Sequence, residues 1–360
     1  MIVVTGTRGI PNVLGGVETH CEHLYPLLVE KGYDITIIRR KGYILDQNKE
    51  YKGVKLVDLN APHKKTLEAI VHTLKAVHIA KFKLKANIIH IHSIGPALII
   101  PYARLLGLKV VFTHHGFDYD RDKWNKTAKF MLKLGERSAA KYANQLIVIS
   151  NVINETLKTK YNRSNANLIY NGVANPIFFT DEDYLKTLGI QPQKYFFAMG
   201  RFVPEKNFHL LIEAFSSIKD KKDYKLVLAG DADFEDKYSA DLKKMADEKG
   251  IVLTGFIKGT NLQTLFTNAS AYILPSSHEG LPISLLEAMS YNLPVIVSNI
   301  PANLEVGLSK ENYFDVNDFN QLKEKIELYL ETVPEKITYQ MDKYDWDKIS
   351  DQVIEVYKKL

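Results

Sequence analysis

The chain has 360 residues, of which 46% are hydrophobic and 25% charged, a composition typical of globular proteins. A single hydrophobic core seldom grows beyond roughly 250–300 residues, so we expect two domains. No run of about 18 apolar residues is present, which excludes a conventional membrane-spanning helix, and the single cysteine, Cys21, excludes an internal disulfide.

Charge is distributed unequally along the chain. Residues 1–177 carry 26 Lys and Arg against 13 Asp and Glu, and the remainder carries 21 against 29, so a basic half precedes an acidic half. The basic half is expected to meet an anionic partner. No nucleic-acid-binding motif accompanies it, so nucleic acid is not expected, and an anionic membrane surface or a lipid-phosphate acceptor fits better. The lone cysteine and the lack of a basic leader predict a cytoplasmic protein, peripheral at the inner face of the membrane if that surface binds.

Apolar strands and amphipathic helices alternate through the first half of the chain. Their near-continuous apolar character fits parallel strands covered on both faces. The predicted strands are residues 1–5, 34–39, 54–59, 87–92, 109–113, 145–150 and 167–170. The helical patterns between them are residues 17–31, 64–85, 96–106, 125–142 and 151–160.

The turn-forming stretch 171–176 interrupts this alternation and is the predicted linker. Strands then recur at residues 195–199, 225–229, 251–254, 271–274 and 294–297. We therefore predict an α/β protein with two doubly wound, Rossmann-like domains, 1–175 and 176–343, which face a central cleft and bind ligands at the carboxyl ends of their strands. Residues 344–360 have the pattern of an amphipathic helix.

Two glutamates, Glu279 and Glu287, bracket the start of a predicted helix that covers residues 283–291. Pro282 is expected at the first helical position, where its fixed φ suits helix entry and its missing N–H has no intrahelical partner. The free N–H groups of the first turn can face a phosphate. One ligand could extend from one carboxylate to the other, although two glutamates at this spacing also fit ordinary surface acids.

A glycine pair, Gly15 and Gly16, lies where the first strand passes into the first helix. The glycines of this loop do not have the Gly-x-Gly-x-x-Gly spacing of a dinucleotide-binding motif, so a dehydrogenase is not expected. Without Cβ atoms, the pair lets a diphosphate approach backbone N–H groups. A plain turn between strand and helix is the alternative.

Two cations, Arg201 and Lys206, follow the first strand of the second half. A guanidinium and an ammonium beside a helix start are suited to neutralising a diphosphate leaving group. Taken singly, each also fits a solvated surface residue.

His114 and His115 close the strand at residues 109–113. Adjacent side chains on a strand point to opposite faces and no third ligand is evident nearby, so we expect no metal there. Asp118, Asp120 and Asp122 alternate just downstream, which fits either a metal-binding Asp-x-Asp pattern or loop acids that face the acceptor.

The predicted helix at 64–85 combines an apolar stripe with many lysines, as in basic amphipathic helices that bind membrane surfaces. The alternative is a core-facing helix with a solvated lysine face. The apolar stripe consists of Leu67, Ile70, Val71, Leu74 and Val77, and the lysines are Lys64, Lys65, Lys75, Lys81, Lys83 and Lys85.

These motifs together resemble one enzyme family. The string Glu-Gly-Leu-Pro-x-x-Leu-Leu-Glu-Ala-Met at 279–289 resembles the donor-site signature of retaining glycosyltransferases of the GT-B fold, and most closely that of glycosyltransferase family four. Gly-Arg-Phe-x-x-Glu-Lys-Asn at 200–207 is similar to the phosphate clamp of that family. The amino-terminal string Gly-Thr-Arg-Gly-Ile-Pro through Gly-Gly-Val-Glu-Thr is similar to bacterial rhamnosyltransferase-like enzymes that build surface polysaccharides.

The resemblance implies transfer of a sugar from a nucleotide-diphosphate donor to a hydroxyl of a glycan or polyprenyl-diphosphate-linked acceptor, with retention of configuration and without a metal or other cofactor. It also implies that the carboxy-terminal helix crosses back onto the first domain. The catalytic residues it implies are Glu279, His115, Arg201 and Lys206. The donor-binding residues it implies are Gly15, Gly16, Arg201, Lys206, Glu279, Gly280, Leu281, Pro282, Ile283 and Glu287, with Glu287 on the ribose. A sugar-nucleotide epimerase, a phosphorylase and a non-catalytic partner subunit remain as alternatives.

Overall fold

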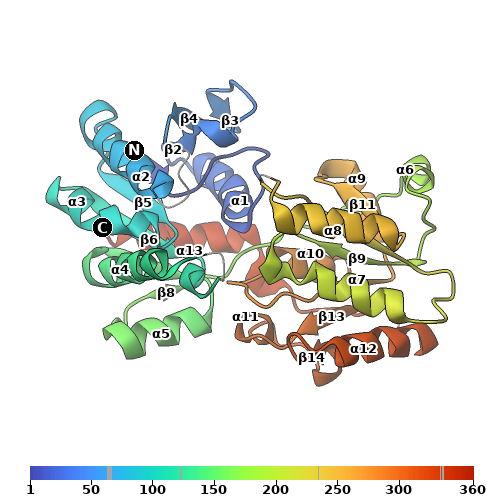
Figure 1. The fold of residues 1–360 in the computed structure, drawn as a ribbon. Coiled ribbons are helices and arrows are strands. Elements are labelled where there is room, and N and C mark those ends of the chain that lie inside the picture. Colours follow the sequence, from blue (N-terminus) through green and yellow to red (C-terminus); the bar gives the residue numbers. More distant parts are fainter. Residues whose placement is uncertain (63–66, 122–123, 234, 333, 335) are drawn as a thin grey trace. The chain divides into compact units, whose positions relative to one another are not determined.

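The computed structural model describes residues 1–62, 67–121, 124–233, 235–332, 334 and 336–360. The chain divides into two compact units (Figure 1). Unit 1 comprises Met1–Gly172 and Lys343–Leu360, and unit 2 comprises Val173–Asp342. Each is a Rossmann-like α/β domain built on a parallel sheet, which confirms the predicted fold class.

The sheet of unit 1 is parallel except at one edge. Within the described residues its strands are β1 (Ile2–Thr5), β2 (Ile35–Arg40), β3 (Glu50–Tyr51), β4 (Val54–Leu59), β5 (Ile88–His92), β6 (Lys109–His114), β7 (Gln145–Val148) and β8 (Asn167–Leu168). They lie in the order β3-β4-β2-β1-β5-β6-β7-β8, and β3 pairs with β4 in the antiparallel direction. The order reverses between β1 and β5, which makes their carboxyl ends a topological switch point.

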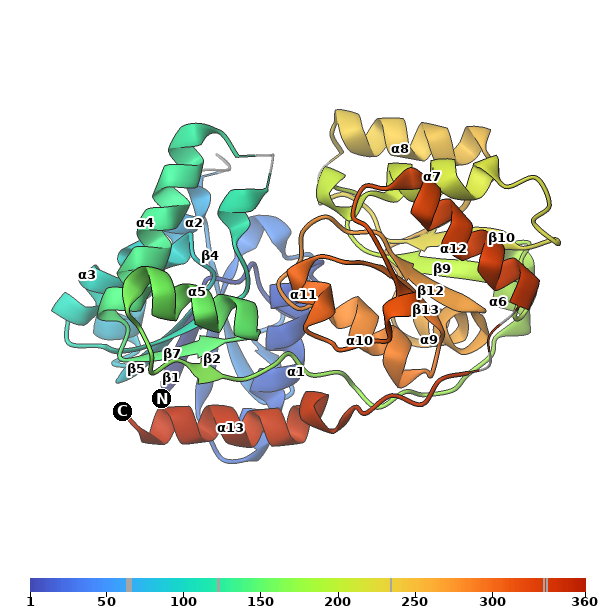
Figure 2. The ribbon, with the colours of Figure 1, turned by 90° about the horizontal axis from the view of Figure 1, so that it is seen from below.

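Helices cover both faces of this sheet (Figure 2). The helices are α1 (Gly16–Glu30), α2 (Glu68–His78), α3 (Ile100–Leu105), α4 (Lys126–Tyr142), α5 (Asn151–Tyr161) and α13 (Trp346–Lys358), with 3-10 turns η3 (Pro96–Ile99) and η4 (Asp118–Asp120). Helices α1 and α13 pack on one face, and α2 and α4 lie on the other. The carboxy-terminal helix α13 belongs to unit 1 because Trp346, Val353 and Tyr357 complete the core beneath α1.

Unit 2 has a sheet of parallel strands. Within the described residues they are β9 (Tyr195–Met199), β10 (Lys225–Ala229), β11 (Val252–Gly255), β12 (Ala271–Leu274), β13 (Val295–Ser298) and β14 (Tyr313–Phe314). Their order is β11-β10-β9-β12-β13-β14, so the chain proceeds from β9 towards one edge and resumes on the other side of β9 at β12. The carboxyl ends of β9 and β12 therefore form the switch point, where open α/β sheets bind ligands.

One hydrophobic cluster of unit 2 lies between this sheet and three helices. Phe196 and Ala198 of β9 pack with Leu211 and Phe215 of one helix and Leu322 of another. The helices of the unit are α6 (Glu182–Thr187), α7 (Phe208–Ser217), α8 (Lys237–Glu248), α9 (Gly259–Asn268), α10 (Ile283–Ser290), α11 (Pro301–Leu304) and α12 (Phe319–Thr332). Helices α7, α8 and α12 lie on one side of the sheet, and α9 and α10 on the other (Figure 2).

The helix predicted at 64–85 is shorter and less regular than expected. Lys64 and Lys65 lie outside the described residues, and α2 begins at Glu68. It passes after His78 into a π-helical turn, η2 (Ile79–Lys83), so the prediction of one regular helix was wrong at the carboxyl end. Periodicity alone does not distinguish a π turn from an α-helix, because the apolar spacing differs by one residue.

None of the described helices has both the length and the apolar character that crossing a bilayer requires. The longest of them, α4, has 17 residues and carries several lysines. This agrees with the sequence, which lacks a long apolar run.

Candidate active site

The loops that follow β9, β10 and β12 meet at the switch point of unit 2. Arg201 and Lys206 come from the loop after β9, and Glu279 comes from the loop after β12. These strands are neighbours in the sheet although some 70 residues separate them in sequence, so parallel pairing brings their carboxyl ends to one edge. The site-forming segments of unit 2 are therefore positioned by the sheet.

Lys206 and Glu279 form a direct ion pair. The Lys206 ammonium Nζ donates to Glu279 Oε1 at 2.5 Å, and the two side chains are only 15% and 12% exposed. The turn that carries Lys206 is held by Asn207, whose backbone adopts the left-handed conformation and whose side-chain amide donates to the Pro275 carbonyl. The loops after β9 and β12 are thus joined by both charge and hydrogen bonds.

Glu279 is held in its ionised form. Burial raises the pKa of its carboxyl, but the Lys206 ammonium and the Ser276 hydroxyl more than offset this, so the pKa lies below its ordinary value. The Lys206 ammonium has three N–H donors, and the bond to Glu279 uses one of them. The pair therefore presents a fixed negative charge beside a cation that retains donor capacity.

Glu287 has the opposite electrostatic character. It lies on α10, where burial raises the pKa of its carboxyl to about 7, and Lys258 only partly offsets this. The phenol of Tyr272 on β12 lies within electrostatic reach of both Glu287 and Glu279. The two glutamates thus occupy one neighbourhood of unit 2 and differ in charge state near neutral pH.

Helix α10 begins at Ile283, as its apolar spacing predicted, but Pro282 does not occupy the first helical position. Pro282 has a ψ of 109°, which is extended, so it is the N-cap and Ile283 is the first helical residue. Its carbonyl accepts the first bonds of the helix, from the N–H groups of Leu285 and Leu286 at 3.1 and 3.3 Å. Gly280 is half-buried in the preceding loop, and the side chains of Leu281 and Ile283 are buried and anchor the helix start.

Arg201 is paired with an acid that sequence reasoning missed. Its Nη1 donates to Asp233 Oδ2 at 3.1 Å, and both side chains are largely buried. Asp233 follows β10, the neighbour of β9 in the sheet. Only strand order could have revealed it, because no motif surrounds it. Nearby on the same loop, Asp231 accepts from Lys243 at 2.9 Å.

In unit 1, Gly15 is the N-cap of α1 and Gly16 is its first residue. Gly15 has a φ of +139°, which strains any residue with a Cβ, and an added Cβ would also displace the Glu18 carboxylate. Glu18 in turn accepts from the Arg8 N–H at 2.9 Å and from the Thr7 hydroxyl, which fixes the preceding loop. A Cβ at Gly16 would meet no atom within 4 Å, so this position leaves room for a ligand.

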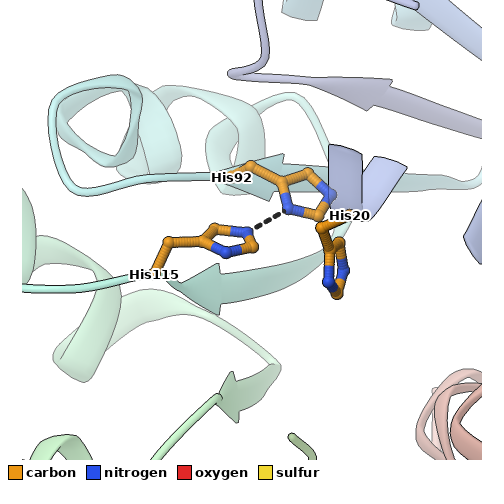
Figure 3. A group of neighbouring side chains, drawn as sticks. All are labelled: His20, His92 and His115. Atoms are coloured by element: carbon orange, nitrogen blue, oxygen red, sulfur yellow. Dashed lines mark hydrogen bonds between the residues drawn. The ribbon is translucent and has the colours of Figure 1, made fainter. Parts of the chain in front are cut away.

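His114 and His115 point in opposite directions, as predicted. His114 is buried and its Nε2 lies 3.1 Å from Glu136 Oε1, a structural contact. His115 lies instead beside two histidines from other parts of unit 1, His20 on α1 and His92 at the end of β5 (Figure 3). The sequence did not reveal this group, because its members come from three separated segments. Of the loop acids, Asp118 contacts Arg121 and Asp122 lies outside the described residues.

Comparison with known families accounts for both units. Residues 14–174 match the family model described as Glycosyltransferase Family 4, and residues 180–345 match the one described as Glycosyl transferases group 1. The chain is a glycosyltransferase. The boundary between the two matches, at residues 174–180, adjoins the start of unit 2 at Val173.

Known proteins are similar to this glycosyltransferase over nearly its whole length. The Escherichia coli UDP-Gal:alpha-D-GlcNAc-diphosphoundecaprenol alpha-1,3-galactosyltransferase is 28% identical, and the alignment covers 94% of this chain and 89% of the E. coli protein. Sucrose-phosphate synthase from Thermosynechococcus elongatus superposes with a TM-score of 0.82 at 19% identity, covering 99% and 98%. HepE of Anabaena in complex with UDP-glucose superposes with a TM-score of 0.78 at 15% identity, covering 100% and 99%. These structural likenesses show the GT-B fold.

Replacing Lys206 with methionine is expected to raise the pKa of Glu279 in this glycosyltransferase. The substitution keeps the length of the side chain and removes the charge, so the burial that disfavours the carboxylate is no longer offset. Carboxyl titration by NMR of glutamate-labelled protein measures the change. Lys243→Met is the matched control, because Lys243 pairs with Asp231 and Glu235 at the same edge of the sheet. An unchanged pKa in Lys206→Met would refute this account of the ion pair.

Proposed function

We propose that this glycosyltransferase moves a sugar from a nucleoside-diphosphate donor to a hydroxyl of a lipid-linked or glycan acceptor, with retention of configuration, in bacterial surface polysaccharide assembly. The Lys206–Glu279 ion pair at the switch point of unit 2 is the observation that carries the proposal. The names of relatives agree with it, since the E. coli enzyme takes UDP-galactose and a diphosphoundecaprenol-linked sugar. A uridine diphosphate sugar is accordingly the first donor to test.

Stabilisation of the leaving diphosphate is the main catalytic contribution that we propose. Arg201 and Lys206 leave the carboxyl end of β9 with their charges near the switch point, and each is held there by an acid. A positioned cation acts on charge that develops in the transition state without further reorganisation, and one such donor contributes roughly 3–4 kcal/mol. Transfer then needs no divalent cation on the diphosphate. That Gly15 and Gly16 also contact the diphosphate stays a prediction.

Retention is proposed to proceed without a covalent glycosyl-enzyme. The carboxylate of Glu279 is engaged by Lys206 at 2.5 Å, which weakens it as a nucleophile and suits it to orient the donor sugar. The acceptor hydroxyl would approach on the face from which the diphosphate departs, and the departing phosphate oxygen would take its proton. We propose that His115 lies near the transferred sugar, where a neutral imidazole can accept a hydrogen bond from a sugar hydroxyl.

Glu287 is proposed to bind the ribose of the donor. Ribose hydroxyls donate to an ionised carboxylate, which would lower the pKa that burial has raised in the free enzyme. The nearby helix start, with Ile283 as its first residue, offers backbone N–H groups to a phosphate. Glu287 and the helix start therefore suit adjacent parts of one nucleotide.

The acceptor is proposed to reach the enzyme at an anionic membrane surface. Helix α2, the turn η2, α3 and α4 carry exposed cations together with apolar side chains that face solvent, notably Phe82, Leu105 and Phe130 at 56%, 82% and 61% exposed. Exposed cations on these elements include Lys75, Lys83, Arg104, Lys126 and Lys133, and Lys85 follows η2. A surface that combines cations with exposed apolar groups is typical of proteins that bind the membrane interface.

Glu279→Ala, Arg201→Ala and Lys206→Ala are each expected to lower the transfer rate by roughly 10²–10³-fold, because each removes a group that acts on the departing diphosphate or the sugar. A thermal-shift screen of UDP-, GDP-, ADP- and dTDP-sugars first selects the donor, since ligand binding raises the apparent stability. Turnover is then measured as transfer to a lipid-linked acceptor.

Lys243→Ala serves as the control for these variants and should retain turnover. Unfolding curves show whether each variant is folded. Wild-type turnover in all three variants would remove the basis of the assignment. Release of sugar phosphate, or interconversion of donors without an acceptor, would point to a phosphorylase or an epimerase on the same fold.

Binding of the intact nucleotide sugar is expected to strengthen by up to about tenfold from pH 6 to pH 8. Glu287 has a raised pKa of about 7, so its ionised fraction rises over this window, and only the ionised form accepts two ribose hydrogen bonds. Calorimetric titration at several pH values measures this. A nucleotide sugar has no phosphate that titrates in this range, and Glu287→Gln should make the affinity independent of pH. If Glu287→Gln showed the same pH dependence of affinity as the parent enzyme, a group other than Glu287 would be responsible for it.

The protein is expected to sediment with anionic liposomes at low salt and not with neutral ones. Lys83→Glu with Lys85→Glu should abolish sedimentation, and Leu105→Ser should weaken it. Lys219→Glu with Lys225→Glu, which reverses two exposed charges of unit 2, is the matched control and should sediment as the parent does. Equal sedimentation with anionic and neutral vesicles would end the membrane proposal.

A further inference from the structure

Three histidines of unit 1 converge from separate elements (Figure 3). His20 lies on α1, His92 ends β5 and His115 follows β6, and one ring nitrogen from each lies within 4.8 Å of the others. His92 Nδ1 and His115 Nε2 are only 2.8 Å apart. Strands β1, β5 and β6 are neighbours in the sheet, so their carboxyl ends and the helix after β1 bring the rings together.

All three rings are neutral at physiological pH. Burial lowers the pKa of His20 to about 4 and holds the pKa of His92 and His115 well below its ordinary value. A neutral imidazole has one N–H and one lone pair, and the lone pair is what a metal ion binds. The cluster thus needs no deprotonation before it can coordinate a cation.

The outer nitrogens of two rings already have hydrogen-bonding partners. His20 Nδ1 lies 3.0 Å from Asn171 Oδ1, an oxygen that only accepts hydrogen bonds. His20 therefore carries its hydrogen on Nδ1, and its Nε2 has the lone pair that can bind a metal ion. His92 Nε2 lies 2.5 Å from the Tyr25 hydroxyl. Such hydrogen bonds to the distant nitrogen fix ring orientation in metal sites.

We propose that His20, His92 and His115 bind a divalent transition-metal ion, Zn²⁺ in particular, with a fourth position open to water or substrate. The ion takes the place of the shared hydrogen between His92 Nδ1 and His115 Nε2. The ring that carried the shared hydrogen changes tautomer and takes that hydrogen on its outer nitrogen, so both rings stay neutral and release no proton. Zn–N bonds of about 2.0–2.1 Å require nitrogens about 3.3 Å apart, so the His92–His115 contact opens slightly and His20 moves inward.

The same ion would inhibit transfer. His115 is half-buried, whereas His20 and His92 are buried, so the cluster is reached from the side of His115. A coordinated His115 no longer offers its lone pair to the sugar. This part rests on the proposed function, whereas metal binding itself does not.

The test uses the full chain after treatment with a chelator. Co²⁺ should bind with one equivalent and give the intense visible bands of a tetrahedral site, and Zn²⁺ should displace it. His20→Ala and, separately, His115→Ala should lose the bands and weaken Zn²⁺ binding by more than tenfold. Asn171→Ala should weaken it by about 10–100-fold, as expected for loss of an orienting partner.

His78→Ala removes an exposed histidine of α2 and is the matched control, which should bind as the parent does. Unfolding curves in chelator identify any variant that fails to fold. If His20→Ala does not fold, His115→Ala still tests the site, because His115 is only half-buried. The proposal is overturned if the parent binds no Co²⁺, or if the histidine variants bind it equally well. If Zn²⁺ binds at this site but leaves transfer unchanged, the inhibition fails while the site stands.

Discussion

The ion pair between Lys206 and Glu279 is the interaction on which the candidate site depends. It joins the loop after β9 to the loop after β12, which are neighbours only because the strand order reverses there. Both side chains are largely withdrawn from water, where an unpaired charge would cost several kcal/mol. The pair therefore fixes both loops and keeps the Glu279 carboxylate ionised. It also leaves the Lys206 ammonium with further N–H donors at the edge of the sheet.

The two glutamates of this site show how position separates identical side chains. Glu279 and Glu287 are eight residues apart and lie near the same tyrosine, yet the pKa of the first is lowered and that of the second is raised to about 7. The Lys206 ammonium bonded to Glu279 lowers the pKa of that carboxyl. Burial raises the pKa of Glu287, and Lys258 offsets this only in part. Groups whose environments shift their pKa values apart are suited to different tasks in one reaction.

The same topological rule operates in unit 1 with different chemistry. Its switch point gathers imidazoles in place of an ion pair: His20 and His92 are buried, His115 is half-buried, and their hydrogen bonds run to Asn171, to Tyr25 and between His92 and His115. The exposed apolar side chains Phe82, Leu105 and Phe130 lie on η2, α3 and α4, whereas α13 packs with α1 over the hydrophobic core.

The alternation of strands and helices, the two-domain fold and the motif residues could be predicted from the sequence, because apolar periodicity and turn residues act locally. The same patterns placed Pro282 one residue too far into the helix and took residues 64–85 as one regular helix, since caps and π turns depend on backbone geometry. The contacts between distant site residues could not be predicted from the sequence. Asp233 beside Arg201, His20 and His92 beside His115, and the raised pKa of Glu287 all arise from strand order and burial, which bring distant segments together and remove them from water.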